Sequence, residues 1–242
     1  MPSSNLFDPR ISQTVRSVWV DAGIDEPYFG IIPLFDLVAS YPIWVSEVED
    51  LSIERAGDFL AEKTGQKPEL GLENFGPISG FFYAYQYRGG FVGCILVEKR
   101  DPIVRRRFSV AHELGHYKLH FEPWLAQLSP EQMEEGILLT DAMVYPKQSE
   151  NADTLTAGAG NALPLHMGEV VRQPAMIMSD KQETEANQFA ASLLMPEDTV
   201  RARAVQFHPP VGQPRGYLAS RLAGEFLVSK EAMAYRLATL GL

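Results

Sequence analysis

The spacing of apolar residues predicts two helices in the first part of the chain. Apolar side chains recur at helical spacing over residues 11–22, and Gly23 follows as a stop signal. Ser52 is a typical N-cap, because its hydroxyl can accept a hydrogen bond from a backbone N–H that the helix leaves free. We expect a second helix from this cap through Thr64, ended by Gly65.

Two runs of apolar and aromatic residues predict a pair of strands. Residues 81–85 are rich in aromatic side chains, and residues 91–97 are apolar on both faces. A strand of the second kind is expected in the middle of a sheet. Gly89 and Gly90 favour a tight turn between the runs, so the two strands should form a hairpin.

The next two predicted helices are longer. Asp101 is expected to cap a helix with Pro102 at its first position, where the missing N–H costs nothing. Its pattern runs to about His120. Another helix is predicted over about residues 181–195, with Asp180 as its cap.

The end of the chain is expected to be helical. Pro196 should stop the preceding helix, and two short helices are expected from about Tyr217 and about Lys230, the second capped by Ser229. Residues 129–180 have a less regular pattern. These elements predict an α+β fold with a small antiparallel or mixed sheet and a helical C-terminal part.

Composition narrows the class of protein. The 242 residues are 45% hydrophobic and carry a formal net charge of −10, which disfavours nucleic acid as the main ligand. Cys94 is the single cysteine, so an intramolecular disulfide and a cysteine-rich metal site are excluded. The N-terminus has no secretory signal pattern, and the apolar stretch over residues 30–45 is too short and interrupted to span a membrane. We expect a cytoplasmic protein.

One motif carries metal chemistry. His112 and His116 are four residues apart, so on a helix both imidazoles can reach one Zn²⁺ ion. Glu113 lies beside them and can take a proton from a water molecule that zinc makes more acidic. This pattern is typical of zinc peptidases.

The surroundings of the motif favour a buried metal site over a chance match. Burying two histidines and a glutamate is costly unless a metal or partner compensates. Gly115 either lets another element approach the metal or is simply tolerated, and both interpretations stay open. His120 is expected to close the helix end. The apolar flanks of the motif are Phe108, Val110, Ala111, Leu114 and Leu119.

A catalytic zinc site usually has three protein ligands, and the second long helix offers the best third one. On a helical wheel Glu183 lies near the apolar stripe that must face the core, whereas Glu185 points outward. Asn187, one turn after Glu183, is placed to hydrogen-bond a liganding histidine. The other candidates for the third ligand are Glu134, Glu135 and His166.

Two blocks of the sequence resemble the ImmA/IrrE-type metallopeptidases. The first block is residues 106–116, RRFSVAHELGH, and the second is residues 183–196, ETEANQFAASLLMP. The resemblance extends thinly from about Ile31 to the C-terminus. It implies a gluzincin-like fold, a zinc peptidase activity, and cleavage of a helix-turn-helix transcriptional repressor in a stress, phage or mobile-element switch.

The same resemblance assigns the site residues. It implies that His112, His116 and Glu183 bind Zn²⁺ and that Glu113 is the catalytic base. Between His116 and Glu183 there are 66 residues, more than the family resemblance leads us to expect. We therefore expect an insertion over about residues 129–180.

The predicted organisation is a metallopeptidase domain over residues 1–200 and a helix-turn-helix-like segment over residues 201–242. Two other functions stay open: a metal-bound sensor or scaffold without proteolysis, and a DNA-binding regulator that uses the C-terminal helices. Cys94 is interpreted as a buried apolar residue, and Arg105–Arg107 as a solvated helix face with one or two structural ion pairs. The candidate donors to the oxyanion are His166, Tyr117 and Tyr83.

Overall fold

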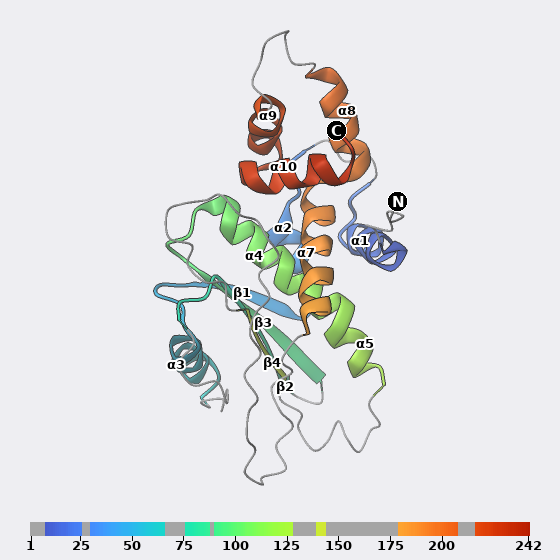
Figure 1. Cartoon of the computed structure of the whole chain (residues 1–242). Coiled ribbons are helices and arrows are strands. Elements are labelled where there is room, and N and C mark those ends of the chain that lie inside the picture. Colours follow the sequence, from blue (N-terminus) through green and yellow to red (C-terminus); the bar gives the residue numbers. More distant parts are fainter. Residues whose placement is uncertain are drawn as a thin grey trace.

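The protein has an α+β fold, seen in a computed structural model (Figure 1). The structure describes residues 8–25, 30–65, 76–87, 90–127, 139–143, 179–207 and 216–242. The helices are α1 (Pro9–Asp21), α2 (Leu34–Val38), α3 (Ile53–Thr64), α4 (Ile103–His116), the π-helical turn η1 (Tyr117–Phe121), α5 (Glu122–Leu125), α7 (Asp180–Leu194), α8 (Glu197–Gln206), α9 (Tyr217–Phe226) and α10 (Lys230–Thr239). The strands are β1 (Ile43–Val48), β2 (Gly80–Tyr87), β3 (Gly90–Glu98) and β4 (Leu139–Met143).

The described strands form one mixed sheet in the order β1-β3-β2-β4. β1 is parallel to β3, and β2 is antiparallel to both β3 and β4. The central position predicted for the apolar strand is therefore confirmed for β3, as is its antiparallel pairing with β2. The predicted turn between them falls partly on residues 88–89, outside the described residues. β4 is a strand within the stretch that the sequence pattern left irregular.

Each face of the sheet packs against a different set of helices. Phe82 and Ile95 belong to the larger apolar core, which includes side chains of α4, α7 and the C-terminal helices. Phe81 and Cys94, their neighbours on the same strands, belong to a second core with side chains of α3. Successive strand residues point to opposite faces, so β2 and β3 each supply both cores. Figure 1 shows α3 on one side of the sheet and α4 on the other.

Two predicted caps are confirmed. The Ser52 hydroxyl accepts a hydrogen bond from the backbone N–H of Arg55, and Gly65 ends α3 in the left-handed conformation with φ of 75°. The Ser229 hydroxyl accepts from the backbone N–H of Ala232 at the start of α10. In each case the short polar side chain replaces a hydrogen bond that the helix cannot make within itself.

The caps predicted for α4 and α7 are wrong by one residue. Pro102, not Asp101, is the N-cap of α4, and it makes no side-chain cap hydrogen bond. Ser179, not Asp180, caps α7, because its hydroxyl accepts from the backbone N–H of Gln182 while the Gln182 side chain accepts from the Ser179 N–H. This reciprocal pair satisfies two donors, which a single aspartate cap does not.

Two helical segments differ from the sequence-based expectation. The helix that carries the histidines does not end near His120, because it continues through the π-helical turn η1 into α5. Pro196 ends α7 and at once begins α8, a helix that was not predicted. A proline is tolerated at a helix start for the same reason that it stops a preceding helix: it has no N–H to donate.

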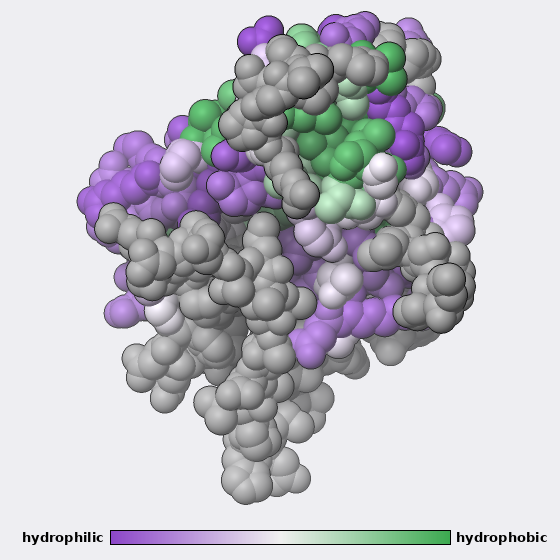
Figure 2. Space-filling view, turned by 45° about the horizontal axis from the view of Figure 1, so that its top comes forward, coloured by the Kyte–Doolittle hydropathy of each residue, from purple (hydrophilic) through white to green (hydrophobic). Residues whose placement is uncertain are grey.

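The C-terminal helices pack on the same core as the metal-motif helix. Leu222 of α9 and Met233 of α10 are fully buried members of the larger core. The buried guanidinium of Arg236 donates to the carbonyl of Met195, at the end of α7, over 3.0 Å. Figure 2 shows hydrophobic residues gathered in the upper part of the molecule, the end where these helices lie in Figure 1.

The described helices are shorter or more polar than a membrane-spanning helix. A transmembrane helix needs about 20 mostly apolar residues. No helix in the described part of the chain is both long and apolar enough for that.

Candidate metal centre

The site lies where α4 and α7 cross at close range. Gly115 is at the crossing: a methyl group placed on its Cα would lie 3.0 Å from the ring of Phe189 and 3.2 Å from the Cα of Ala186. A larger residue would push the helices apart, because protein cores have little free space. Of the two interpretations of Gly115, the structure favours the one in which it lets α7 approach the histidines.

The structure brings together the three residues predicted to bind metal. The Nε2 atoms of His112 and His116 are 2.7 Å apart. The Glu183 carboxylate lies 3.5 Å from each of them, through Oε2 to His112 and Oε1 to His116. The candidate ligand atoms of all three residues fall within 4.8 Å of one another. Both imidazoles are fully buried, and the Glu183 side chain is 34% exposed, so the site opens toward solvent on the side of Glu183.

This donor set fits a zinc ion. Tetrahedral Zn²⁺ with bonds of about 2.0–2.1 Å places its ligand atoms about 3.3 Å apart, close to both histidine–carboxylate separations. The histidine nitrogens would have to separate by about 0.6 Å from their 2.7 Å spacing. Two nitrogens and one carboxylate oxygen are a usual set for catalytic zinc.

Asn187 sets the direction of one histidine lone pair. The Nδ1 atom of His112 lies 3.0 Å from Oδ1 of Asn187. Because an amide oxygen only accepts, Nδ1 carries the proton and the lone pair of Nε2 points at the site. The hydrogen bond predicted between Asn187 and a candidate ligand is thus present.

Burial keeps the site histidines neutral. Loss of hydration lowers the pKa of His112 to about 3, although its hydrogen bond to Asn187 acts to raise it. Burial also lowers the pKa of His116 well below its ordinary value, and the nearby His112 lowers it further. Neutral imidazoles present lone pairs without first losing a proton, which favours metal binding.

The third candidate ligand has the opposite shift. Burial raises the pKa of Glu183, while the nearby His116 and His120 act to lower it. A cation placed between Glu183 and the histidines would favour its ionised form, because opposite charges stabilise each other at short range.

Glu113 is buried against the first residue of β2. A methyl group on Gly80 would lie 2.5 Å from Oε1 of Glu113 and 3.3 Å from Cβ of Ser109. The absence of a side chain at Gly80 therefore leaves space for this carboxylate. Glu113 follows His112 on α4 and is fully buried, so the predicted base lies beside the candidate ligands.

Two expectations about neighbouring residues are wrong. Glu185 does not point outward: its side chain is 9% exposed and its Oε2 lies 3.0 Å from Nε2 of His120. The reason is that α7 is also covered by α1, so it has more than one buried side. His120 is not at a helix end either, because η1 continues into α5 and His120 is buried. Burial lowers the pKa of His120, although Glu185 acts to raise it.

The candidate oxyanion donors lie elsewhere or outside the described residues. Tyr83 belongs to the core on the α3 face of the sheet, away from α4, and its ring stacks on Tyr85. Tyr117 packs among aromatic rings, with its centroid 6.0 Å from that of Phe82. The third candidate donor, His166, is not among the described residues, and neither are Glu134 and Glu135, which with His166 were the other candidates for the third metal ligand.

Cys94 is buried in the core on the α3 face, and burial raises the pKa of its thiol well above the ordinary value. Its interpretation as a small apolar residue is confirmed. The ion pairs expected for the arginine run are present: Arg105 pairs with Asp101 at 3.3 Å, and Arg106 pairs with Glu47. The expected solvated face is wrong for Arg107, which is buried and donates to the carbonyl of Ile32.

The fold and this site together define a class of protein. A helix that carries two histidines and a glutamate, crossed by a second helix that brings a carboxylate, is the arrangement of a metallopeptidase. The chain belongs to the peptidase M78 family, described as the IrrE N-terminal-like domain, whose profile matches residues 73–135 and 177–238, just over half of the chain. The resemblance seen in the two sequence blocks is therefore confirmed.

The family profile does not match the whole chain. Residues 136–176, between the two matched segments, are not matched, and neither is the chain before residue 73. A search among curated proteins found no match to this chain.

Proposed function

We propose that the chain is a zinc-dependent endopeptidase of the cytoplasm. The observation that carries this proposal is the convergence of His112, His116 and Glu183 from two helices, with Glu113 buried beside them. Membership of a peptidase family supports the same assignment. In this assignment the three converging residues hold the ion, which when bound polarises the scissile carbonyl and makes a water molecule more acidic.

The chain's own residues then have distinct roles. Glu113 accepts the proton of the attacking water, a role for which its position next to His112 on α4 is suited. Asn187 holds His112 in the tautomer whose Nε2 lone pair faces the site. The burial of both imidazoles keeps water from competing with these contacts.

The proposed substrate is a helix-turn-helix transcriptional repressor, cleaved in a stress, phage or mobile-element switch. The family membership supports a protein substrate, and the resemblance of the two sequence blocks implies a repressor. The unmatched residues 136–176 between the two family segments support the idea of an inserted specificity element, lid or inhibitory flap. In the sequence they lie between α4 and α7, the two helices that supply the site.

The Glu113→Gln variant tests the catalytic assignment. The amide has nearly the same shape but cannot accept the water proton, so we expect full zinc binding and loss of cleavage. The measurement is mass spectrometry of repressors from the same genome after incubation with zinc-loaded wild-type or variant protein. Equal fragments from both proteins would contradict the role of Glu113. Zinc-loaded wild-type protein that leaves every repressor intact would contradict the proposed substrate and favour a non-proteolytic sensor.

A further inference from the structure

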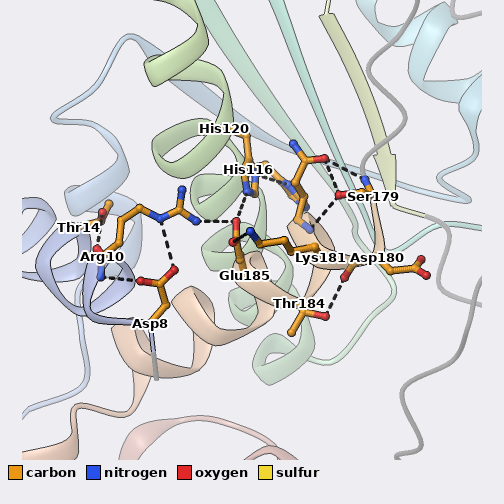
Figure 3. A network of polar contacts seen from close by, with 11 residues as sticks. Asp8, Arg10, Thr14, His116, His120, Ser179, Asp180, Lys181, Thr184 and Glu185 are labelled. Carbon is orange, nitrogen blue, oxygen red and sulfur yellow. Dashed lines mark hydrogen bonds and ion pairs between the residues drawn. The ribbon is translucent and has the colours of Figure 1, made fainter. Parts of the chain in front are cut away.

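A line of polar contacts runs from the metal centre to the N-terminal helix (Figure 3). Nδ1 of His116, the ring atom that faces away from the site, lies 3.2 Å from Nδ1 of His120. Nε2 of His120 lies 3.0 Å from Oε2 of Glu185. The same carboxylate oxygen is 2.7 Å from Nη2 of Arg10, on α1.

The donors and acceptors in this line can be ordered in one way once His116 binds a metal. Its Nε2 must then offer a lone pair, so its proton is on Nδ1 and is donated to His120. Nδ1 of His120 therefore accepts, and the His120 proton is on Nε2, where Glu185 accepts it. A carboxylate is the right group at this end, because it only accepts and is stabilised by the Arg10 cation.

We propose that His120, Glu185 and Arg10 are positioning residues of the metal centre, which fix the tautomer and ring orientation of His116. The inference rests on the proposed role of His116 as a metal ligand. His120 and the Glu185 side chain are buried, so water does not readily replace either partner. His112 has the equivalent support from Asn187, so each liganding imidazole has its own acceptor on the outer nitrogen.

This line of contacts, from His116 through His120 and Glu185 to Arg10, is called the relay below. It gives the N-terminal helix a role at the metal centre. α1 lies outside the segments that the family profile matches, yet Arg10 completes the relay. Asp8 orients this arginine: it caps α1 by accepting from the Arg10 backbone N–H, and its carboxylate lies 3.6 Å from Nε of the same residue. The π-helical turn η1 also contributes, because it carries His120 while keeping it in contact with His116.

Zinc affinity of the full-length protein tests the relay. Loss of a residue that supports a metal ligand commonly weakens metal binding about 10- to 100-fold, and we expect this range for Glu185→Ala. Glu185→Gln should be intermediate, because its amide oxygen still accepts from His120. Arg10→Ala should have a smaller effect of a few-fold, because its side chain is 51% exposed. The measurement is competition for zinc with a chromophoric chelator.

Lys181→Ala is the matched control. Its ammonium is 3.7 Å from the other Glu185 oxygen and its side chain is 83% exposed, so the variant removes a cation from the same carboxylate without breaking the line to His120. We expect wild-type zinc affinity. Thermal unfolding of the metal-free proteins identifies any variant that has lost its fold, and Arg10→Ala and Glu185→Gln then stand in for a misfolded Glu185→Ala.

A spectroscopic measurement separates positioning from general stability. In ¹⁵N–¹H spectra of the zinc-loaded wild type, we expect the His120 proton on Nε2. A proton on Nδ1 of His120, or wild-type zinc affinity in Glu185→Ala, would overturn the relay while leaving the proposed function in place. A wild-type protein that does not bind zinc would overturn the proposed function and the relay with it.

Discussion

At the scale of single residues, the position of the candidate base depends on a glycine in a neighbouring strand. Gly80 begins β2, and its Cα faces the carboxylate of Glu113 on α4. Neither the HExxH motif nor the strand pattern predicts this contact, because it depends on how closely the strand crosses the helix. The contact makes Gly80 a sensitive test of the role of Glu113.

We expect Gly80→Ala to reduce peptidase activity strongly while zinc content stays unchanged. The added methyl group would lie 2.5 Å from Oε1 of Glu113, so the carboxylate must move. A displacement of about 1 Å at a catalytic group can reduce the rate on the order of 100-fold. The measurement is repressor cleavage alongside zinc content. Gly76→Ala is the control, because a methyl group there meets nothing within 4 Å. Equal activity of the two variants would contradict the role of this contact.

Some residues of the candidate site could be predicted from the sequence and others could not. His112, Glu113 and His116 follow from their spacing on one helix, and Glu183 from its side of the apolar stripe of α7. Arg10 and Glu185 could not be found in this way. Their contact joins segments 175 positions apart in the chain, and nothing in local periodicity reports such a pairing.

At the scale of elements, the metal centre depends on the close crossing of α4 and α7. Helical-wheel analysis assumes that a helix has one buried side. The wheel correctly places Glu183 on the side that faces the site. It wrongly predicts that Glu185 is exposed, because α1 covers a further side of α7. The π-helical turn after His116 and the start of α8 at Pro196 were missed for a related reason: tertiary packing, not local preference, determines how a helix continues.

Opposite changes in stability are expected for two glycine-to-alanine substitutions, one at the crossing and one away from it. At Gly115 the methyl group would meet the Phe189 ring at 3.0 Å and the α7 backbone at 3.2 Å, so we expect the free energy of unfolding to fall by about 1–3 kcal/mol. At Gly224, in α9, the methyl group meets nothing within 4 Å, so the greater helix propensity of alanine should raise it by up to about 1 kcal/mol.

Urea unfolding of the metal-free variants measures both changes. A Gly115→Ala protein as stable as the wild type would show that α4 and α7 can separate without cost. It would also return Gly115 to the interpretation in which glycine is merely tolerated.

At the scale of the whole molecule, the strand pairing and the helix order agree with the predicted α+β class. The division into residues 1–200 and 201–242 stays a prediction, although side chains of α9 and α10 belong to the same core as those of α4 and α7. Sequence patterning could predict the elements but not this shared core, because their apolar faces do not specify which partner each one meets.

The charge of the whole chain gives little support to DNA binding. The net charge is −10. Of the three basic residues of α9 and α10, two have contacts within the fold. Arg236 is buried and donates to Met195, and the Arg221 guanidinium lies 5.1 Å from the centroid of the Phe207 ring. A nucleic-acid-binding surface needs accessible basic groups.

We propose above all that side chains from α4 and α7, two helices far apart in the sequence, hold one zinc ion. The most direct test is the zinc content of the purified 242-residue chain, measured by elemental analysis for the wild type and for Glu183→Ala, with Gly76→Ala as the control. We expect one zinc per chain in the wild type and the control, removable by a chelator, and much less in Glu183→Ala. A wild type without metal, or a Glu183→Ala variant that retains it in full, would contradict the account.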